Sequence, residues 1–322
     1  MSRQNPMVII ALGGNALSPK NEAGNITQQF RHTEESLEVV MHFVEERYNI
    51  CITHGNGPQV GAELLKNEFT QDKVPPLPLA VLVANTQGAI GYMIQQTLQN
   101  ALHRKDIDRE VVTFISQVQV DQHDPAIKNP VKFIGKTYTN KEAEHYQNLH
   151  NWIMKEQEGG DWRRVVPSPT PHYIFNGKSV KHIVEFGSIV IAGGGGGIPA
   201  YHDDSGTLHG LDAVIDKDMS AALLGRVIKA DELFIITDVD QVYLNYGSKN
   251  QSKITHTTVE KLKKWEELGH FGAGTMFMLA WWLILTGNAE GPTTLFERIY
   301  IGYSYTPLGS VIGAAYGFVD FG

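Results

Sequence analysis

The sequence contains only one cysteine, Cys51, among its 322 residues. A single thiol excludes an intramolecular disulfide and a cysteine-based zinc cluster, and it favours a reducing compartment. Long hydrophobic runs are also missing. The apolar run at 7–12 ends at glycine, and FMLAWWLIL at 277–285 has about half the length that a membrane span needs. We therefore expect a cytoplasmic protein without a secretory signal or a membrane span.

Positive charge is scarce. The chain has 27 lysines and arginines against 35 aspartates and glutamates, which gives a net charge of −8. Such a chain has no general attraction for nucleic acids or anionic membranes, so we expect neither as a partner. An anionic ligand would have to be held by local cations and backbone N–H groups. The hydrophobic content of 42% is typical of a globular protein and argues against disorder.

Common nucleotide and metal signatures are missing as well. The strings GKT at 135–137 and GKS at 177–179 lack the glycine that a Walker loop requires five positions earlier. A Rossmann GxGxxG motif is also absent, because Val60 occupies the position of its last glycine in GNGPQV. The 13 histidines include no HExxH pair, so the sequence predicts no dedicated metal cage.

Short apolar runs of strand length alternate with amphipathic helical stretches along the chain. This alternation is typical of βαβ units on a buried parallel sheet, in which ligands bind at the carboxyl ends of the strands. The expected strands are 7–12, 49–53, 110–115, 188–192 and 232–237, and the expected helices are 27–48, 58–69, 82–104 and 218–229. Residues 121–171 are polar and break this rhythm. We interpret them as an inserted subdomain, such as a lid, with a long surface loop as the alternative.

Glycine-rich turns follow three of the expected strands: LGGNA at 12–16, HGNGPQVG at 54–61 and AGGGGGIP at 192–199. Glycines allow consecutive N–H groups to point into one concavity, and the start of a following helix adds its positive dipole. Three such turns at one sheet edge favour a site for a multiply charged ligand, such as a transferring phosphoryl group. Alternatively, the turns only connect strands to helices, or the five glycines form a slack linker. His54 either contacts a ligand or holds its turn by a hydrogen bond.

Lys217 stands at the expected start of a helix, between Asp216 and Asp218. Carboxylates commonly cap the free N–H groups there, whereas a cation is disfavoured at the positive end of the helix dipole. The position of Lys217 therefore indicates a phosphate partner. Further along, Tyr243 and Tyr246 either cover a nucleobase or serve as packing residues in a strand.

Nine segments in order resemble the carbamate kinases of the amino acid kinase family: VIIALGGNAL, THGNGPQVG, TQGAIGYMIQQTLQN, NPVKFIG, RRVVPSPTP, GGGGIP, DAVIDKDMSAALLG, ITDVDQVYLNYG and GHFGAGTM. The resemblance covers about residues 7–276 and implies an open αβα sandwich with a mainly parallel central sheet. It also implies a homodimer, and it divides the chain into an N-terminal carbamate-binding lobe at 1–210, a protruding subdomain at about 123–167 and a C-terminal nucleotide-binding lobe at 211–322.

The resemblance also assigns roles to the residues that match. The catalytic residues would be Lys132, Asp216, Lys217 and Asp218, with an aspartate organising cations. The substrate-binding residues would be Gly13, Gly14, Asn15, Gly55, Asn56, Gly57, Gly194, Gly195 and Gly196. The nucleotide-binding residues would be Lys217, Asp238, Tyr243, Tyr246, His270, Gly274, Thr275 and Met276. Mg²⁺ would be carried by ATP or ADP rather than by a protein cage.

The activity that the resemblance implies is direct, in-line phosphoryl transfer between ATP and carbamate, which gives ADP and carbamoyl phosphate without a phosphoenzyme. It suggests ATP formation in arginine catabolism as the direction. Catalysis of this kind depends mainly on positioning and on neutralising the phosphoryl oxygens. Two alternatives stay open: a nucleotide-binding homologue without turnover, and another amino acid kinase that acts on a carboxylate.

The resemblance ends at Met276. The family continues with a proline and a lysine that reaches the transferring phosphate, whereas Leu279 occupies that lysine position here. Losing such a cation is expected to cost on the order of 10²–10³ in rate. Residues 277–322 are atypical, and 270–322 contain only four charged residues, Glu290, Glu297, Arg298 and Asp320. The tail is interpreted as the product of a shifted reading frame, as a divergent functional tail, or as a new interaction surface.

Overall fold

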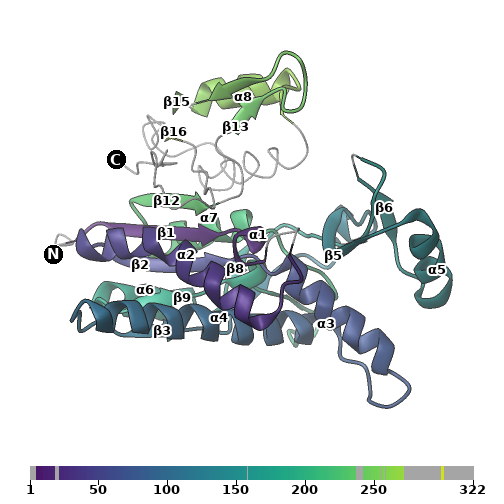
Figure 1. Cartoon of the computed structure of the whole chain (residues 1–322), viewed down its shortest axis with the longest axis horizontal. Helices are drawn as coiled ribbons and strands as arrows, with labels where there is room; N and C mark the ends of the chain where they lie inside the picture. Colours follow the sequence, from purple (N-terminus) through teal and green to yellow (C-terminus); the bar gives the residue numbers. More distant parts are fainter. Residues whose placement is uncertain are drawn as a thin grey trace.

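The computed structural model describes residues 5–18, 22–157, 159–236, 242–254, 256–257, 259–271 and 299–300. At its centre is a sheet of five parallel strands in the order β12-β1-β2-β9-β3 (Figure 1). These strands are β1 (Met7–Leu12), β2 (Asn49–His54), β3 (Val111–Thr113), β9 (Ile189–Ile191) and β12 (Glu232–Ile236). They coincide closely with the five expected runs, which confirms the α/β fold with a mainly parallel central sheet.

Helices cover both faces of this sheet. They are α1 (Gly14–Leu17), α2 (Ile26–Glu45), α4 (Leu79–Arg104), α6 (Gly177–Phe186) and α7 (Lys217–Ile228). A further helix, α3 (Gly57–Thr70), follows β2 and packs beside α4 in a separate core. Successive residues of a strand point to opposite faces. Accordingly, Ile10 and Leu12 pack in a core with α2 and α4, whereas Ile9 and Ala11 pack in another core with α6 and α7. This is the layering of an open αβα sandwich.

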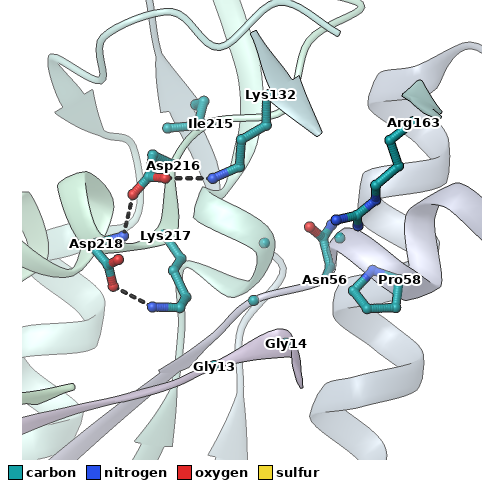
Figure 2. A pocket seen from close by; sticks show the side chains of 13 residues that line it. Gly13, Gly14, Asn56, Pro58, Lys132, Arg163, Ile215, Asp216, Lys217 and Asp218 are labelled. Carbon is teal, nitrogen blue, oxygen red and sulfur yellow. Dashed lines mark hydrogen bonds and ion pairs between the residues drawn. The ribbon is translucent and has the colours of Figure 1, made fainter. Parts of the chain in front are cut away.

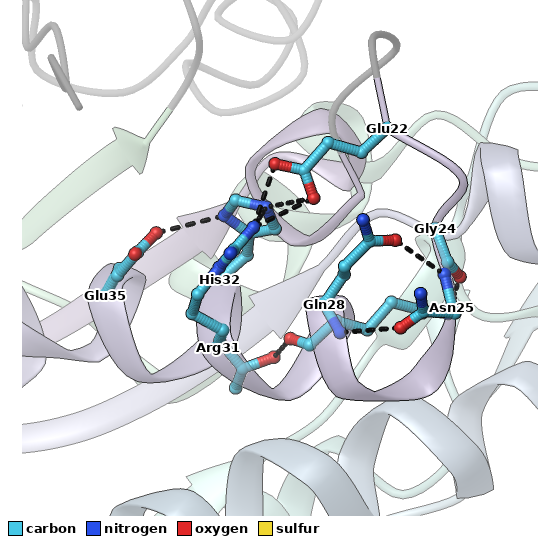
Figure 3. Close-up of polar contacts among 9 residues, drawn as sticks. Glu22, Gly24, Asn25, Gln28, Arg31, His32 and Glu35 are labelled. Atoms are coloured by element: carbon cyan, nitrogen blue, oxygen red, sulfur yellow. Dashed lines mark hydrogen bonds and ion pairs between the residues drawn. The ribbon is translucent and has the colours of Figure 1, made fainter.

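The start of α2 is fixed by local polar contacts (Figure 3). The Asn25 side chain accepts a hydrogen bond from the Gln28 N–H, and the Gln28 side chain accepts one from the Asn25 N–H, both at 3.0 Å. This reciprocal capping satisfies N–H groups that the first helical turn leaves free. One turn further on, the His32 ring lies 3.1 Å from Glu22 and 3.0 Å from Glu35, so it links the preceding segment to the helix.

A second sheet of four strands was not expected. It has the order β11-β10-β4-β8 and consists of β4 (Gln117–Gln119), β8 (Tyr173–Ile174), β10 (Ile198–His202) and β11 (Leu208–Gly210). Only β10 and β4 are parallel. These strands are short, and β4 reads QVQ with one buried residue, so it gives no apolar run. β10 begins directly after the five glycines.

The segment that breaks the βα alternation contains its own antiparallel sheet. The strands β5 (Lys132–Tyr138), β7 (Trp162–Val166) and β6 (Met154–Glu156) pair in that order, and α5 (Asn140–His150) connects β5 to β6. This unit projects away from the central sheet at the right of Figure 1. A small aromatic core that includes Tyr138 and Trp152 holds it together. We call residues 132–166 the projecting unit.

The last described elements are β13 (Val242–Leu244), β14 (Ser252–Ile254), β15 (His256–Thr257), α8 (Val259–Glu267) and β16 (Ile299–Tyr300). β13 pairs with β14, and β15 with β16, both antiparallel. In the described ranges, no helix is both long and apolar enough to span a bilayer. The expected nucleotide residues Asp238, Gly274, Thr275 and Met276 lie outside the described residues, as does Leu279.

Candidate active site

The four expected catalytic residues and most of the expected substrate-binding residues meet around one cavity at the carboxyl end of the central strands (Figure 2). Its volume is about 210 Å³. Turns after three strands, the start of α7 and the projecting unit all contribute to its walls. The lining residues are Gly13, Gly14, Gly55, Asn56, Gly57, Pro58, Lys132, Arg163, Gly195, Ile215, Asp216, Lys217 and Asp218. The first, second and fourth expected strands therefore deliver their glycine turns to a shared space.

The first two glycine turns are in direct contact. A Cβ added to Gly55 would lie 2.8 Å from the backbone N of Gly14 and 3.3 Å from the Lys217 side chain. Both turns are also tied to the sheet, because Gly13 N–H donates to Ile236 O at 2.8 Å and Gly55 N–H donates to Leu12 O at 2.9 Å. Any larger residue at position 55 would push the two turns apart.

The five glycines are a buried, tightly packed turn and not a slack linker. Gly195 is the member that lines the cavity. It has φ +63°, and an added Cβ would lie 2.2 Å from Nδ2 of Asn56. The neighbouring glycines meet protein atoms: a Cβ on Gly194 would collide with His54, and one on Gly196 with the Ile215 carbonyl. The lack of side chains thus serves close packing of the cavity wall as well as access to the backbone.

His54 holds its turn rather than lining the cavity. Its ring is buried, and Nδ1 lies 3.0 Å from Gly55 O, which accepts a hydrogen bond. Burial lowers the pKa of this histidine to about 4, although the hydrogen bond to Gly55 acts in the opposite direction. The imidazole is therefore neutral at pH 7. Of the two roles that the sequence left open for His54, the structure shows the second, a hydrogen bond that holds the turn.

The four expected catalytic residues form two ion pairs in the cavity wall (Figure 2). Lys132 of the projecting unit pairs with Asp216, and Lys217 pairs with Asp218. Asp216 also caps α7 by accepting a hydrogen bond from the Asp218 N–H at 2.9 Å. Burial opposes ionisation of Asp216, but Lys132 and Lys217 outweigh it, so the pKa of this carboxyl lies below its usual value. Both lysines thus reach the same side of the cavity.

Arg163 is a cavity residue that the sequence analysis did not single out. It comes from β7, and its Nε donates a hydrogen bond to Gly135 O of β5 at 3.0 Å. A strand exposes alternate residues on opposite faces, so one arginine of the pair in RRVV had to face away from its neighbour. This alternation predicts that the two arginines point to opposite faces of the strand. It does not predict that Arg163 faces this cavity.

Of the expected nucleotide residues that the structure describes, Lys217 lines the cavity, whereas Tyr243, Tyr246 and His270 lie outside the lining. The rings of Tyr243 and Tyr246 are 5.7 Å apart, and Tyr246 is 65% exposed. His270 Nδ1 lies 3.0 Å from Oδ1 of Asn245, between the two tyrosines in sequence. These residues therefore gather around the β13 hairpin. The remaining expected substrate residue, Asn15, lies in α1 directly after Gly14.

The chain belongs to the amino acid kinase family, whose profile matches residues 6–290. Among curated relatives, carbamate kinases from Pyrococcus horikoshii and Trichomonas vaginalis are 42% and 40% identical to it over 271 residues, which are 84% of this chain and 86% of each relative. A solved structure of carbamate kinase from Giardia lamblia bound to AMP-PNP is 34% identical, with a TM-score of 0.77 over 88% of this chain and 90% of that one. The Giardia enzyme bound to citric acid gives a TM-score of 0.81 at 33% identity, with coverage of 88% and 90%.

Proposed function

We propose that this protein is a carbamate kinase, which transfers a phosphoryl group between ATP and carbamate and forms ADP and carbamoyl phosphate. The observation that carries the proposal is the meeting of three glycine turns with Lys132 and Lys217 in one cavity of about 210 Å³. A cavity of this size suits a substrate of a few heavy atoms. The carbamate kinases among the relatives add the substrate class.

Each lysine is proposed to exchange its partner when the ligand binds. Lys132 and Lys217 are each paired with a carboxylate in the structure. A phosphoryl group would take the place of Asp216 and Asp218 on the two ammonium groups, because it carries more charge. The carboxylates would then be available to a cation. Since the lysines are held in the cavity wall before binding, little reorganisation is required during the reaction.

Mg²⁺ fits the donors that this site supplies. Magnesium in kinases is bound by one or two carboxylates together with phosphate oxygens of the nucleotide. Asp216 and Asp218 offer two such carboxylates, and within the described ranges no cluster of three or more His, Cys, Asp or Glu side chains suggests a separate cage. Bound there, the ion would neutralise charge on the phosphoryl oxygens.

The transfer is proposed to be direct. In the described lining, no hydroxyl, thiol or imidazole side chain is available as a nucleophile, and each of the two carboxylates is paired with a lysine. Phosphoryl groups pass through a loose transition state, so the protein acts mainly by alignment and charge neutralisation. The backbone N–H groups of the glycine turns and the two lysines would supply that neutralisation.

The nucleotide is assigned to the side of the C-terminal residues. Tyr243, Tyr246 and His270 gather at the β13 hairpin, and the Giardia relative was solved with AMP-PNP. We assign Asp238 and the segment Gly274 to Met276 to the same site from the family motifs. Tyr246 is 65% exposed, so an adenine ring could stack on it without displacing packed residues.

The test is a coupled assay of ATP formation from carbamoyl phosphate and Mg-ADP with the full chain. Turnover at ordinary kinase rates is expected if Leu279 costs little. Calorimetric binding of ADP without turnover would favour the alternative, a nucleotide-binding homologue, and activity gained by Leu279→Lys would explain it. Turnover with another carboxylate in place of carbamate would indicate a different amino acid kinase.

A homodimer is part of the proposal. β3 is an edge strand of the central sheet, and a groove of about 450 Å³ runs between Thr113 of β3 and Tyr92 of α4. Tyr92 is 58% exposed, and an edge strand beside exposed aromatic surface suits pairing with a second copy. Light scattering after gel filtration should give about twice the 35.7 kDa chain mass. A mass of one chain would contradict the dimer.

The setting of the reaction rests on the family resemblance. We assign the protein to the cytoplasm and the reaction to ATP formation in arginine catabolism. The single cysteine, Cys51, agrees with a reducing compartment. The measured ratio of the two catalytic rates at cellular ADP and ATP concentrations would test the direction, and a strong preference for carbamoyl phosphate synthesis would contradict it.

A further inference from the structure

We propose that Arg163 binds the planar carbamoyl end of the substrate and stabilises the carbamate that leaves when the phosphoryl group is transferred. This inference rests on the proposed function for the identity of the ligand. It adds a third cation to the site, from the projecting unit, with a role different from that of the two lysines.

The charges that line the cavity single out Arg163. The lining contains three cations and two carboxylates, which leaves a net charge of +1. Lys132 and Lys217 are each paired with an aspartate. Arg163, by contrast, forms no ion pair with any residue that the structure describes, and its one hydrogen bond goes to the Gly135 carbonyl. The uncompensated charge of the cavity therefore belongs to Arg163.

The guanidinium lies apart from the lysines. In Figure 2 it approaches Asn56 and Pro58, whereas Lys217, Asp216 and Asp218 lie on the opposite side of the cavity. A ligand that reached both sides would place one end against the lysines and the other against Arg163. Lysine acts on phosphate as a point charge, whereas the planar guanidinium fork matches a planar carboxylate. The phosphoryl end thus belongs with the lysines and the carbamoyl end with Arg163.

The fold of the projecting unit fixes the position of the Arg163 side chain. Its Nε is occupied by Gly135 O at 3.0 Å, which leaves the terminal amino groups for the cavity. Gly135 is itself packed on α3, since a Cβ on Gly61 would lie 2.0 Å from the Gly135 Cα. On the other face of β7, the Arg164 guanidinium lies 4.4 Å from the Trp152 ring. Strand β7 is therefore fixed on both of its faces.

The chemical step explains why this contact would affect the rate. In ATP formation, the bond between phosphorus and the carbamoyl oxygen breaks, and a new bond forms between phosphorus and the terminal oxygen of ADP. The electron pair of the broken bond stays on the carbamate oxygen, so a neutral carbamoyl group becomes an anion. A guanidinium that contacts this oxygen binds the carbamate anion more strongly than the acyl phosphate, and this difference lowers the barrier.

The test compares Arg163→Gln and Arg163→Lys with Arg109→Gln in the full chain. Arg109 is a matched control, because its Nε also donates to a backbone carbonyl, that of Gly187, and it does not line the cavity. We expect Arg163→Gln to lower kcat for ATP formation about tenfold to a hundredfold, with the KM for ADP unchanged. Arg163→Lys should recover only part of this loss, and Arg109→Gln should retain the wild-type rate.

Calorimetry with carbamoyl phosphate separates failure of this inference from failure of the proposed function. If the wild type turns over and Arg163→Gln matches it within twofold, the inference is wrong and the function stands. If the wild type does not turn over but binds carbamoyl phosphate at least tenfold more tightly than Arg163→Gln, the inference stands and the function fails. If the wild type does not turn over, equal binding by both proteins, or no binding by either, overturns the inference.

Discussion

Lys132 and Asp216 form an ion pair at the cavity although 84 residues separate them in the chain. Lys132 is the first residue of β5 in the projecting unit, and Asp216 caps the start of α7. The pair therefore joins the projecting unit to the helix whose next residue is Lys217. The ion pair also keeps the Lys132 ammonium group at the cavity wall, where a bound phosphoryl group would contact it.

Replacing Lys132 should damage catalysis far more than replacing a neighbouring lysine. We expect Lys132→Met to lower kcat by about 10²–10³, in line with the loss of one preorganised donor at a reaction centre. Lys136→Met is the control, because Lys136 lies on the same strand, is exposed and contacts the Tyr138 ring. Steady-state kinetics of both variants test this prediction. Equal kcat values for Lys132→Met and Lys136→Met would exclude Lys132 from the mechanism.

The buried His54 predicts a loss of stability in mild acid. Burial lowers its pKa to about 4, below the ordinary histidine pKa of 6.5. Between these values the unfolded chain binds a proton that the folded chain does not, so stability falls as the pH drops from about 6.5 to 4. The loss should be roughly 3 kcal/mol. Urea unfolding across this range should show that the free energy of unfolding depends less on pH in His54→Asn than in the wild type. The exposed His103→Gln should show the same pH dependence as the wild type. A wild type with constant stability would contradict the assignment.

Gly195→Ala should abolish activity by moving Asn56. The new Cβ would lie 2.2 Å from the Asn56 amide, and φ at this position is +63°. Gly206→Ala separates the two effects, because Gly206 has φ +82° and no heavy atom within 4 Å of an added Cβ. That control should lose about 1 kcal/mol of stability from backbone strain and keep its kcat. If both variants retain full activity, the packing of the five-glycine turn does not shape the site.

Gly61 and Gly88 test how the projecting unit is held. Both are helical glycines, in α3 and α4. A Cβ on Gly61 would lie 2.0 Å from the Cα of Gly135, whereas one on Gly88 would meet nothing within 4 Å. Gly61→Ala should therefore destabilise the protein by about 1–3 kcal/mol. Gly88→Ala should stabilise it by about 0.5–1 kcal/mol. Thermal unfolding of the pair checks this, and a stabilised Gly61→Ala would show that α3 and β5 are not in close contact.

The central sheet could be predicted from sequence because its strands are buried on both faces. A run such as MVIIAL at 7–12 is apolar throughout, so its burial appears directly in the composition. The second sheet gave no such signal. β4 has a single buried side chain, Val118, and its partners come from residues far away in the chain. Its strands depend on tertiary pairing that no local pattern encodes.

The candidate site could be predicted in part, because the parallel strands that carry it could be predicted. Parallel strands bring the turns at their carboxyl ends together, so the meeting of Gly13, Gly55 and Gly195 followed from the strand pattern. The position of Arg163 did not follow. It depends on how β7 packs on β5 and how Gly135 approaches α3, which are contacts between distant segments. The roles of these residues in binding and catalysis remain predictions.

The most direct test of the account is the rate of ATP formation from carbamoyl phosphate and Mg-ADP by the wild-type chain and by Lys217→Ala. Lys217 lies in the cavity wall beside Gly55, where the glycine turns meet. The account predicts turnover by the wild type and loss of at least about 10²-fold in kcat in the variant. Unchanged kinetics in Lys217→Ala would contradict the claim that this cavity carries out phosphoryl transfer.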